Sequence, residues 1–105
     1  MIKEYQVYYY RSIEMYGRGQ CTDFEPGETH AFIKSVYAEH INDVYRKMQG
    51  FVWSPEGEAV PLIKAAGVYH TSMSVGDVVI DGNGNAWMVM PFGWKQVVKK
   101  YYSVW

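Results

Sequence analysis

The sequence predicts a small α+β domain in which an antiparallel sheet of about four to five strands packs against one main amphipathic helix. Residues 81–85 are glycine- and asparagine-rich and separate two short apolar runs, which is the pattern of a β-hairpin. Residues 39–49 carry apolar side chains at helical spacing. With 105 residues, of which 49% are hydrophobic, the chain can bury a core as a single domain over residues 1–105.

The N-terminal third of the chain predicts two strands joined by a loop. Residues 2–11 are rich in Tyr and Val, which pack well on a pleated surface. Residues 17–27 contain three glycines and a proline without an apolar period, which is typical of a surface loop. Residues 29–37 alternate between two faces and predict a second strand. One face of this strand is expected to carry Ala31, Ile33 and Ser35.

The middle of the chain predicts the helical part of the domain. Within residues 39–49, four apolar side chains follow the i, i+3, i+4, i+7 spacing of one helical face, namely Ile41, Val44, Tyr45 and Met48. Gly50 is the expected C-terminal end of this helix. Residues 58–66 predict a short second helix that ends at Gly67, with Pro61 in its first turn.

The C-terminal third predicts the hairpin and one further strand. Residues 77–80 and 86–90 are short apolar runs on either side of the 81–85 turn, where glycine and asparagine tolerate positive φ. Residues 94–98 then form a last extended run after a proline- and glycine-containing turn.

Composition and charge limit the possible classes of protein. The formal net charge of -1 does not supply the broad basic field of a general DNA binder. Cys21 is the single cysteine, so no intramolecular disulfide and no cysteine-rich metal site can form. The N-terminus lacks the apolar core of a secretion signal, and no stretch has the roughly 18 apolar residues of a membrane span. We therefore expect a cytoplasmic protein without a membrane partner.

One run of residues resembles a known group of proteins. Residues 70–79 read His-Thr-Ser-Met-Ser-Val-Gly-Asp-Val-Val, and residues 86–94 read Ala-Trp-Met-Val-Met-Pro-Phe-Gly-Trp. Together with Gly82 and the upstream residues 44–50 and 53–55, they resemble small uncharacterised proteins of tailed phages and mobile elements, which are similar to the YodL-like domains found beside antirestriction proteins. The resemblance covers about the last two thirds of the chain. It implies a phage or mobile-element protein in a bacterial host cell but brings no established activity or cofactor.

The residues that mark this resemblance also have a structural interpretation. They are His70, Ser72, Met73, Ser74, Gly76 and Asp77. Gly76 permits a sharp turn, the Asp77 carboxylate can accept a bond from a nearby amide, and the serines can bond exposed backbone groups. Serine, histidine and an acid would also suit an enzyme centred on residues 70–77, but the nucleophile-elbow pattern is absent. The sequence favours a folding element over a ligand site.

Metal and nucleotide sites are weakly indicated. A zinc site would require His30, His40 and His70 to converge with a carboxylate such as Asp43. His40 and Asp43 are three residues apart on one helix, which more commonly gives an ordinary surface pair. The glycine pairs do not continue into a phosphate-binding motif, and nearby Asp23 disfavours a thiolate at Cys21. We expect no metal and no cofactor.

The aromatic content favours a recognition protein. Aromatic residues make up 17% of the chain, ten of them Tyr, and such side chains are enriched at interfaces. We expect a non-enzymatic accessory protein that binds a host or phage protein, in host takeover or anti-defence. Edge strands rich in Tyr and Val would allow a homodimer. The candidate contact residues are Trp53, Trp94, Tyr101, Tyr102 and Trp105.

A single-stranded nucleic-acid binder is the alternative. Near the C-terminus, cations alternate with aromatic rings, and single strands are held by phosphate neutralisation together with base stacking. This cluster consists of Trp94, Lys95, Lys99, Lys100, Tyr101, Tyr102 and Trp105.

Overall fold

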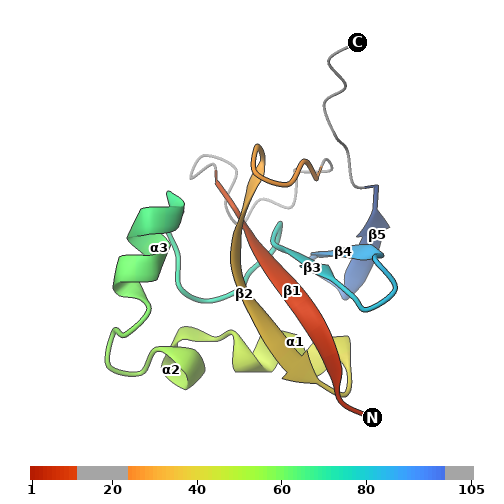
Figure 1. Cartoon of the computed structure of the whole chain (residues 1–105), viewed down its shortest axis with the longest axis horizontal. Helices are drawn as coiled ribbons and strands as arrows, with labels where there is room; N and C mark the ends of the chain where they lie inside the picture. Colours follow the sequence, from red (N-terminus) through yellow and green to blue (C-terminus); the bar gives the residue numbers. More distant parts are fainter. Residues whose placement is uncertain (12–23, 99–105) are drawn as a thin grey trace.

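A five-stranded antiparallel sheet forms the centre of the computed structural model, which describes residues 1–11 and 24–98 (Figure 1). Its strand order is β2-β1-β3-β4-β5. The strands are β1 (Lys3–Tyr10), β2 (His30–Ala38), β3 (Val78–Ile80), β4 (Ala86–Val89) and β5 (Trp94–Val97). The predicted α+β class, the number of strands and the approximate position of each strand are confirmed.

The described residues form three short helices, whereas the sequence predicts one main helix and a short second helix. The three helices are α1 (Ile41–Lys47), α2 (Gly50–Trp53) and α3 (Val60–Ala66). The prediction for α3 is confirmed, because Pro61 lies in its first turn and Gly67 ends it with a φ of 73°. No helix in the described residues has the length and apolarity needed to cross a membrane.

The prediction that Gly50 ends the main helix is wrong. The helix already ends at Lys47, and Gly50 begins α2. The reason is a contact with a distant segment: the Met48 carbonyl accepts a hydrogen bond from the Met73 amide at 3.1 Å, and the Gly50 amide donates to Ser72 Oγ at 2.7 Å. The chain between α1 and α2 is therefore held by residues 71–73.

The expected face of the second strand is correct only for its first half. Val7 pairs with Lys34 and Tyr8 pairs with Phe32, so Ile33 is an extra residue at a β-bulge. Beyond the bulge the alternation changes phase, and Val36 is buried in place of Ser35. A single added residue moves the following side chains to the opposite face.

Each face of the sheet carries a buried hydrophobic cluster. The helix-facing core includes Tyr5, Val7 and Tyr9 of β1 together with Val44 and Met48. The opposite face holds a second cluster of Phe24, Val78, Ile80, Ala86, Met88 and Val97. Because β3 lies between two cores, all three of its residues are buried, which explains its continuous apolar sequence.

The predicted hairpin between β3 and β4 is confirmed. The Asp81 amide donates to the Asn85 carbonyl at 2.9 Å, and Gly84 has a φ of 84°. The Asp81 carboxylate accepts the amides of Asn83 and Asn85 at 2.9 and 3.0 Å. The turn thus combines a glycine in the left-handed region with an aspartate that satisfies the backbone.

Candidate functional site

The segment 70–77 folds around the side chain of Asp77, which is fully buried at the start of β3. Asp77 Oδ1 accepts the Tyr10 amide at 2.9 Å. Oδ2 accepts the Ser74 amide at 2.9 Å and lies 2.8 Å from His70 Nε2. Burial raises the pKa of Asp77, while the bonds from His70 and the two amides act in the opposite direction. The carboxyl group therefore links β1 to the loop that precedes β3.

His70 completes this buried network. Only 7% of its side chain is exposed, and its ring stacks on Tyr9 with centroids 4.5 Å apart and an interplanar angle of 17°. The Tyr9 hydroxyl in turn donates to the Thr71 carbonyl at 2.7 Å. The loop is thereby fixed to the helix-facing side of β1.

A second buried histidine supports the turn at Gly76. His30 Nε2 donates to the Gly76 carbonyl at 2.7 Å, and Nδ1 accepts the Thr29 hydroxyl at 2.7 Å. A carbonyl can only accept, so the His30 proton resides on Nε2. Burial lowers the pKa of His30 to about 4, although the bond to Gly76 acts to raise it. His30 is therefore neutral at physiological pH. The turn that it supports requires a glycine, because Gly76 has a φ of 98°.

The two serines of the segment do not form a catalytic relay with His70. Ser72 Oγ accepts the Gly50 amide. Ser74 Oγ is buried and has no hydrogen-bond partner among the described residues. Met73 is a core residue with 1% exposure. In the described part of the chain, the side chains of His70, Ser72 and Asp77 bond one another or the neighbouring backbone, and none of them lines a hollow.

The metal candidates are likewise dispersed. His30 lies beside Gly76 and His70 beside Asp77, whereas His40 is exposed at the start of α1. Asp43 forms an ion pair with Arg46. No group of three histidine, cysteine, aspartate or glutamate side chains suitable for a metal occurs within residues 1–11 and 24–98.

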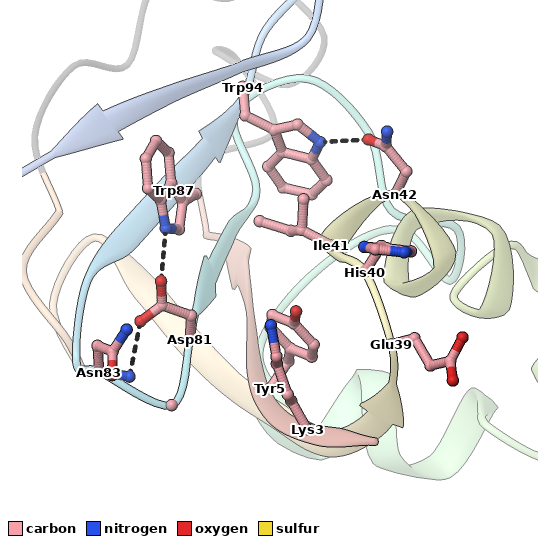
Figure 2. A pocket seen from close by; sticks show the side chains of 11 residues that line it. Lys3, Tyr5, Glu39, His40, Ile41, Asn42, Asp81, Asn83, Trp87 and Trp94 are labelled. Atoms are coloured by element: carbon pink, nitrogen blue, oxygen red, sulfur yellow. Dashed lines mark hydrogen bonds between the residues drawn. The ribbon is translucent and has the colours of Figure 1, made fainter. Parts of the chain in front are cut away.

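A different part of the molecule has the form of a binding site. A hollow of about 760 Å³ lies between β1, the start of α1, the β3–β4 turn and the strands β4 and β5 (Figure 2). Its aromatic lining comes from Tyr5, Trp87 and Trp94. Trp87 pairs with Gln96 and Val89 pairs with Trp94, so both indoles are on one face of the sheet. This is the helix-facing side, and α1 lies beside the hollow.

Hydrogen bonds orient both indoles of the hollow. Trp94 Nε1 donates to Asn42 Oδ1 at 2.9 Å, and Trp87 Nε1 donates to Asp81 Oδ2 at 2.9 Å (Figure 2). Partial burial acts to raise the pKa of Asp81, but the bonds from Trp87 and from the amides of Asn83 and Asn85 outweigh it and lower the pKa. Asp81 is therefore a fixed negative charge in the wall of the hollow at neutral pH.

Of the predicted contact residues that the structure describes, one lines this hollow. Trp94 lines it, whereas the Trp53 indole donates to the Thr71 carbonyl at 2.9 Å and lies under the Lys34 ammonium, 5.4 Å from its ring centroid. Lys95 is exposed on β5. The predicted contacts Lys99, Lys100, Tyr101, Tyr102 and Trp105 lie outside the described residues, as does Cys21.

Sequence reasoning did not select Trp87. The signal was present, because residues 87 and 94 fall on neighbouring strands of the predicted sheet. Their shared face follows only from the pairing of β4 with β5, and the turn at residues 90–93 leaves several pairings open.

Comparisons of the chain with protein-family models, with curated proteins and with solved structures found no match. The site is therefore defined by its own geometry, as an aromatic hollow in a small α+β domain.

Proposed function

We propose that the chain is a non-enzymatic accessory protein of a phage or mobile element, which binds a host or phage protein in the bacterial cytoplasm. The observation that carries the proposal is the hollow around Trp87 and Trp94, whose indoles are held in place by Asp81 and Asn42. Pre-oriented tryptophans in a concave site are typical of recognition surfaces. The resemblance of residues 70–79 and 86–94 to mobile-element proteins is the reason for proposing this biological setting.

Binding fits the geometry better than catalysis. Asp77 accepts three hydrogen bonds, and His70 is held between Asp77 and the Tyr9 ring. Such contacts position the loop, and in the described residues no nucleophile joins them. The sequence interpretation of residues 70–77 as a folding element is the one we adopt.

A protein partner fits the hollow better than a nucleic acid. The lining of the hollow has one lysine, Lys3, and the Asp81 carboxylate is held beside Trp87, while the Glu39 carboxylate lies 3.7 Å from the N-terminal ammonium. Carboxylates repel phosphates, and nucleic-acid binding depends on phosphate neutralisation. The alternative of a single-stranded nucleic-acid binder depends chiefly on lysines and rings beyond residue 98.

Affinity capture from a bacterial lysate tests this proposal with three forms of the full chain. The native protein should retain one stoichiometric partner, and Trp94→Ala should lose it. Phe51→Ala is the matched control, because Phe51 is an exposed aromatic residue of α2 that does not line the hollow. It should retain the partner.

A second variant separates loss of binding from loss of folding. Asn42→Ala removes the acceptor of the Trp94 indole at an exposed position. It should weaken capture, while the free energy of unfolding measured in urea should fall by no more than about 0.5 kcal/mol. Absence of a stoichiometric partner for the native protein, or capture that persists in Trp94→Ala, would contradict the proposal. Salt-sensitive binding of short oligonucleotides would favour the nucleic-acid alternative.

A further inference from the structure

We infer that the hollow binds a soluble, uncharged saccharide of at least two pyranose rings. The inference goes beyond the proposed function and does not depend on it, because it assigns a small-molecule ligand to the hollow. Three features of the described residues carry it: two fixed indoles that offer carbon surface to a ligand, a balance of charge in the lining, and side-chain groups that supply both hydrogen-bond donors and acceptors.

The two indoles form an apolar platform for a ligand. Trp87 Nε1 donates to Asp81 Oδ2 at 2.9 Å. Trp94 Nε1 donates to Asn42 Oδ1 at the same distance. Because both N–H groups are bonded within the protein, the rings offer only carbon surface to a ligand. One face of a pyranose ring consists largely of C–H groups, which pack on aromatic faces through dispersion and through attraction to the π electrons.

The spacing of the indoles suits more than one sugar ring. Trp87 pairs with Gln96 and Val89 pairs with Trp94, so the two tryptophans occupy diagonal positions on neighbouring strands. Such positions are roughly 7–8 Å apart. The volume of about 760 Å³ also falls in the usual range of small-molecule sites, roughly 300–1,000 Å³. A disaccharide would therefore place one ring against each indole.

The charges of the lining favour an uncharged ligand. The Asp81 carboxylate and the Lys3 ammonium contribute one charge of each sign. Glu39 supplies a second carboxylate, but this group lies 3.7 Å from the N-terminal ammonium. The formal charges therefore balance, and neither an anion nor a cation gains a net electrostatic attraction to the hollow.

The polar groups of the lining match the hydroxyls of a sugar. Asp81 Oδ2 accepts an indole N–H, and a carboxylate oxygen can accept a second hydrogen bond. Asn42 uses its amide oxygen for the other indole, which leaves its NH₂ group as a donor. Figure 2 shows the Tyr5 hydroxyl and the Lys3 ammonium pointing into the same space. Each sugar hydroxyl both donates and accepts, so two adjacent hydroxyls would donate to Asp81 and accept from Lys3.

Titration of the full ¹⁵N-labelled chain with uncharged disaccharides tests the inference. The probes are cellobiose, maltose, lactose and N,N′-diacetylchitobiose, and nuclear magnetic resonance follows the N–H signals. At least one disaccharide should give saturable shifts that include the indole signals of Trp87 and Trp94. Sorbitol has hydroxyls of the same kind on a flexible chain without a ring face, so it should bind about tenfold more weakly or less.

Variants of the protein locate the saccharide. Trp94→Ala should weaken binding of that disaccharide by about tenfold or more, because it removes one of the two platforms. Lys3→Met keeps most of the side-chain length but removes the donor, and it should weaken binding by about threefold to tenfold. Phe51→Ala, an exposed aromatic residue outside the hollow, is the matched control and should bind as the native chain does. Lys3 is exposed, so its variant remains informative if Trp94→Ala perturbs β5.

The outcomes distinguish this inference from the proposed function. No saturable binding of any of the four disaccharides, equal binding of sorbitol, or unchanged binding by Trp94→Ala would overturn the inference. Tighter binding of glycine betaine or of oligothymidylate would overturn it in favour of a zwitterion or a nucleic acid. If the disaccharides fail while capture of a protein depends on Trp94, the inference falls and the proposed function stands. If a disaccharide binds while no protein is captured, the reverse holds.

Discussion

Acidification should destabilise the protein through His30. The imidazole is fully buried, and burial lowers its pKa from 6.5 to about 4. In the unfolded chain the same group binds a proton near pH 6.5, so between these two values the unfolded state binds more protons than the folded state. The contribution of the neutral His30 to stability is therefore fully present above pH 6.5. It decreases as the pH falls through this window and is lost below about pH 4.

The magnitude follows from the difference between the two pKa values. It is about 2.5, and each pKa unit corresponds to about 1.36 kcal/mol, so His30 should account for about 3 kcal/mol of the free energy of unfolding. Burial of Asp77 raises its pKa, so its contribution has the opposite sign and decreases as the pH rises through that raised value. An assay must separate these two groups.

Urea unfolding of the native protein and of His30→Gln, measured between about pH 7.5 and about pH 4, makes this separation. Glutamine can still donate to the Gly76 carbonyl but has no proton to gain. Asp77 is present in both proteins, so its contribution cancels in the difference. The native protein should lose about 3 kcal/mol more than the variant over this range. Parallel pH profiles would refute the role of His30 as a buried neutral donor.

Two further predictions concern the 70–77 loop, and urea midpoints check both. Asp77→Asn should lower stability by about 2–4 kcal/mol, because an amide oxygen cannot accept the three hydrogen bonds of the carboxylate; an unchanged midpoint would contradict the anchoring role of this side chain. Ser72→Ala should cost about 1 kcal/mol because the Gly50 amide loses its acceptor, whereas Ser74→Ala should be neutral or stabilising because Ser74 Oγ has no partner in the described residues. The reverse order would show that Ser74, rather than Ser72, holds the loop.

Local patterns predicted the elements that local forces determine. The β3–β4 turn and the end of α3 follow from glycines at positive φ, and Gly84 and Gly67 adopt that conformation. The Tyr- and Val-rich composition of β1 and the alternation of β2 also predicted that these strands form, but not the bulge at Ile33 that changes the buried face of β2. Elements held by distant contacts were less predictable: α1 ends early because residues 71–73 bind the chain at Met48 and Gly50.

The candidate site depends mainly on contacts that no local pattern contains. Asp77 was expected to bond a nearby amide, and it does bond that of Ser74, but its bond to the Tyr10 amide spans 67 residues. Trp94 was selected for its chemistry alone. Its role in a hollow required the pairing of β4 with β5, which places Trp87 on the same face.

The central claim is that recognition takes place at the hollow of Trp87 and Trp94, while residues 70–77 support the fold. The most direct test is a nuclear magnetic resonance titration of the ¹⁵N-labelled chain with the partner protein captured from the lysate, in which the indole N–H signals are followed. The signals of Trp87 and Trp94 should shift, and that of Trp53, which does not line the hollow and donates to the Thr71 carbonyl, should stay in place. Shifts confined to Trp53 or to residues 70–77, with Trp87 and Trp94 unmoved, would contradict the claim.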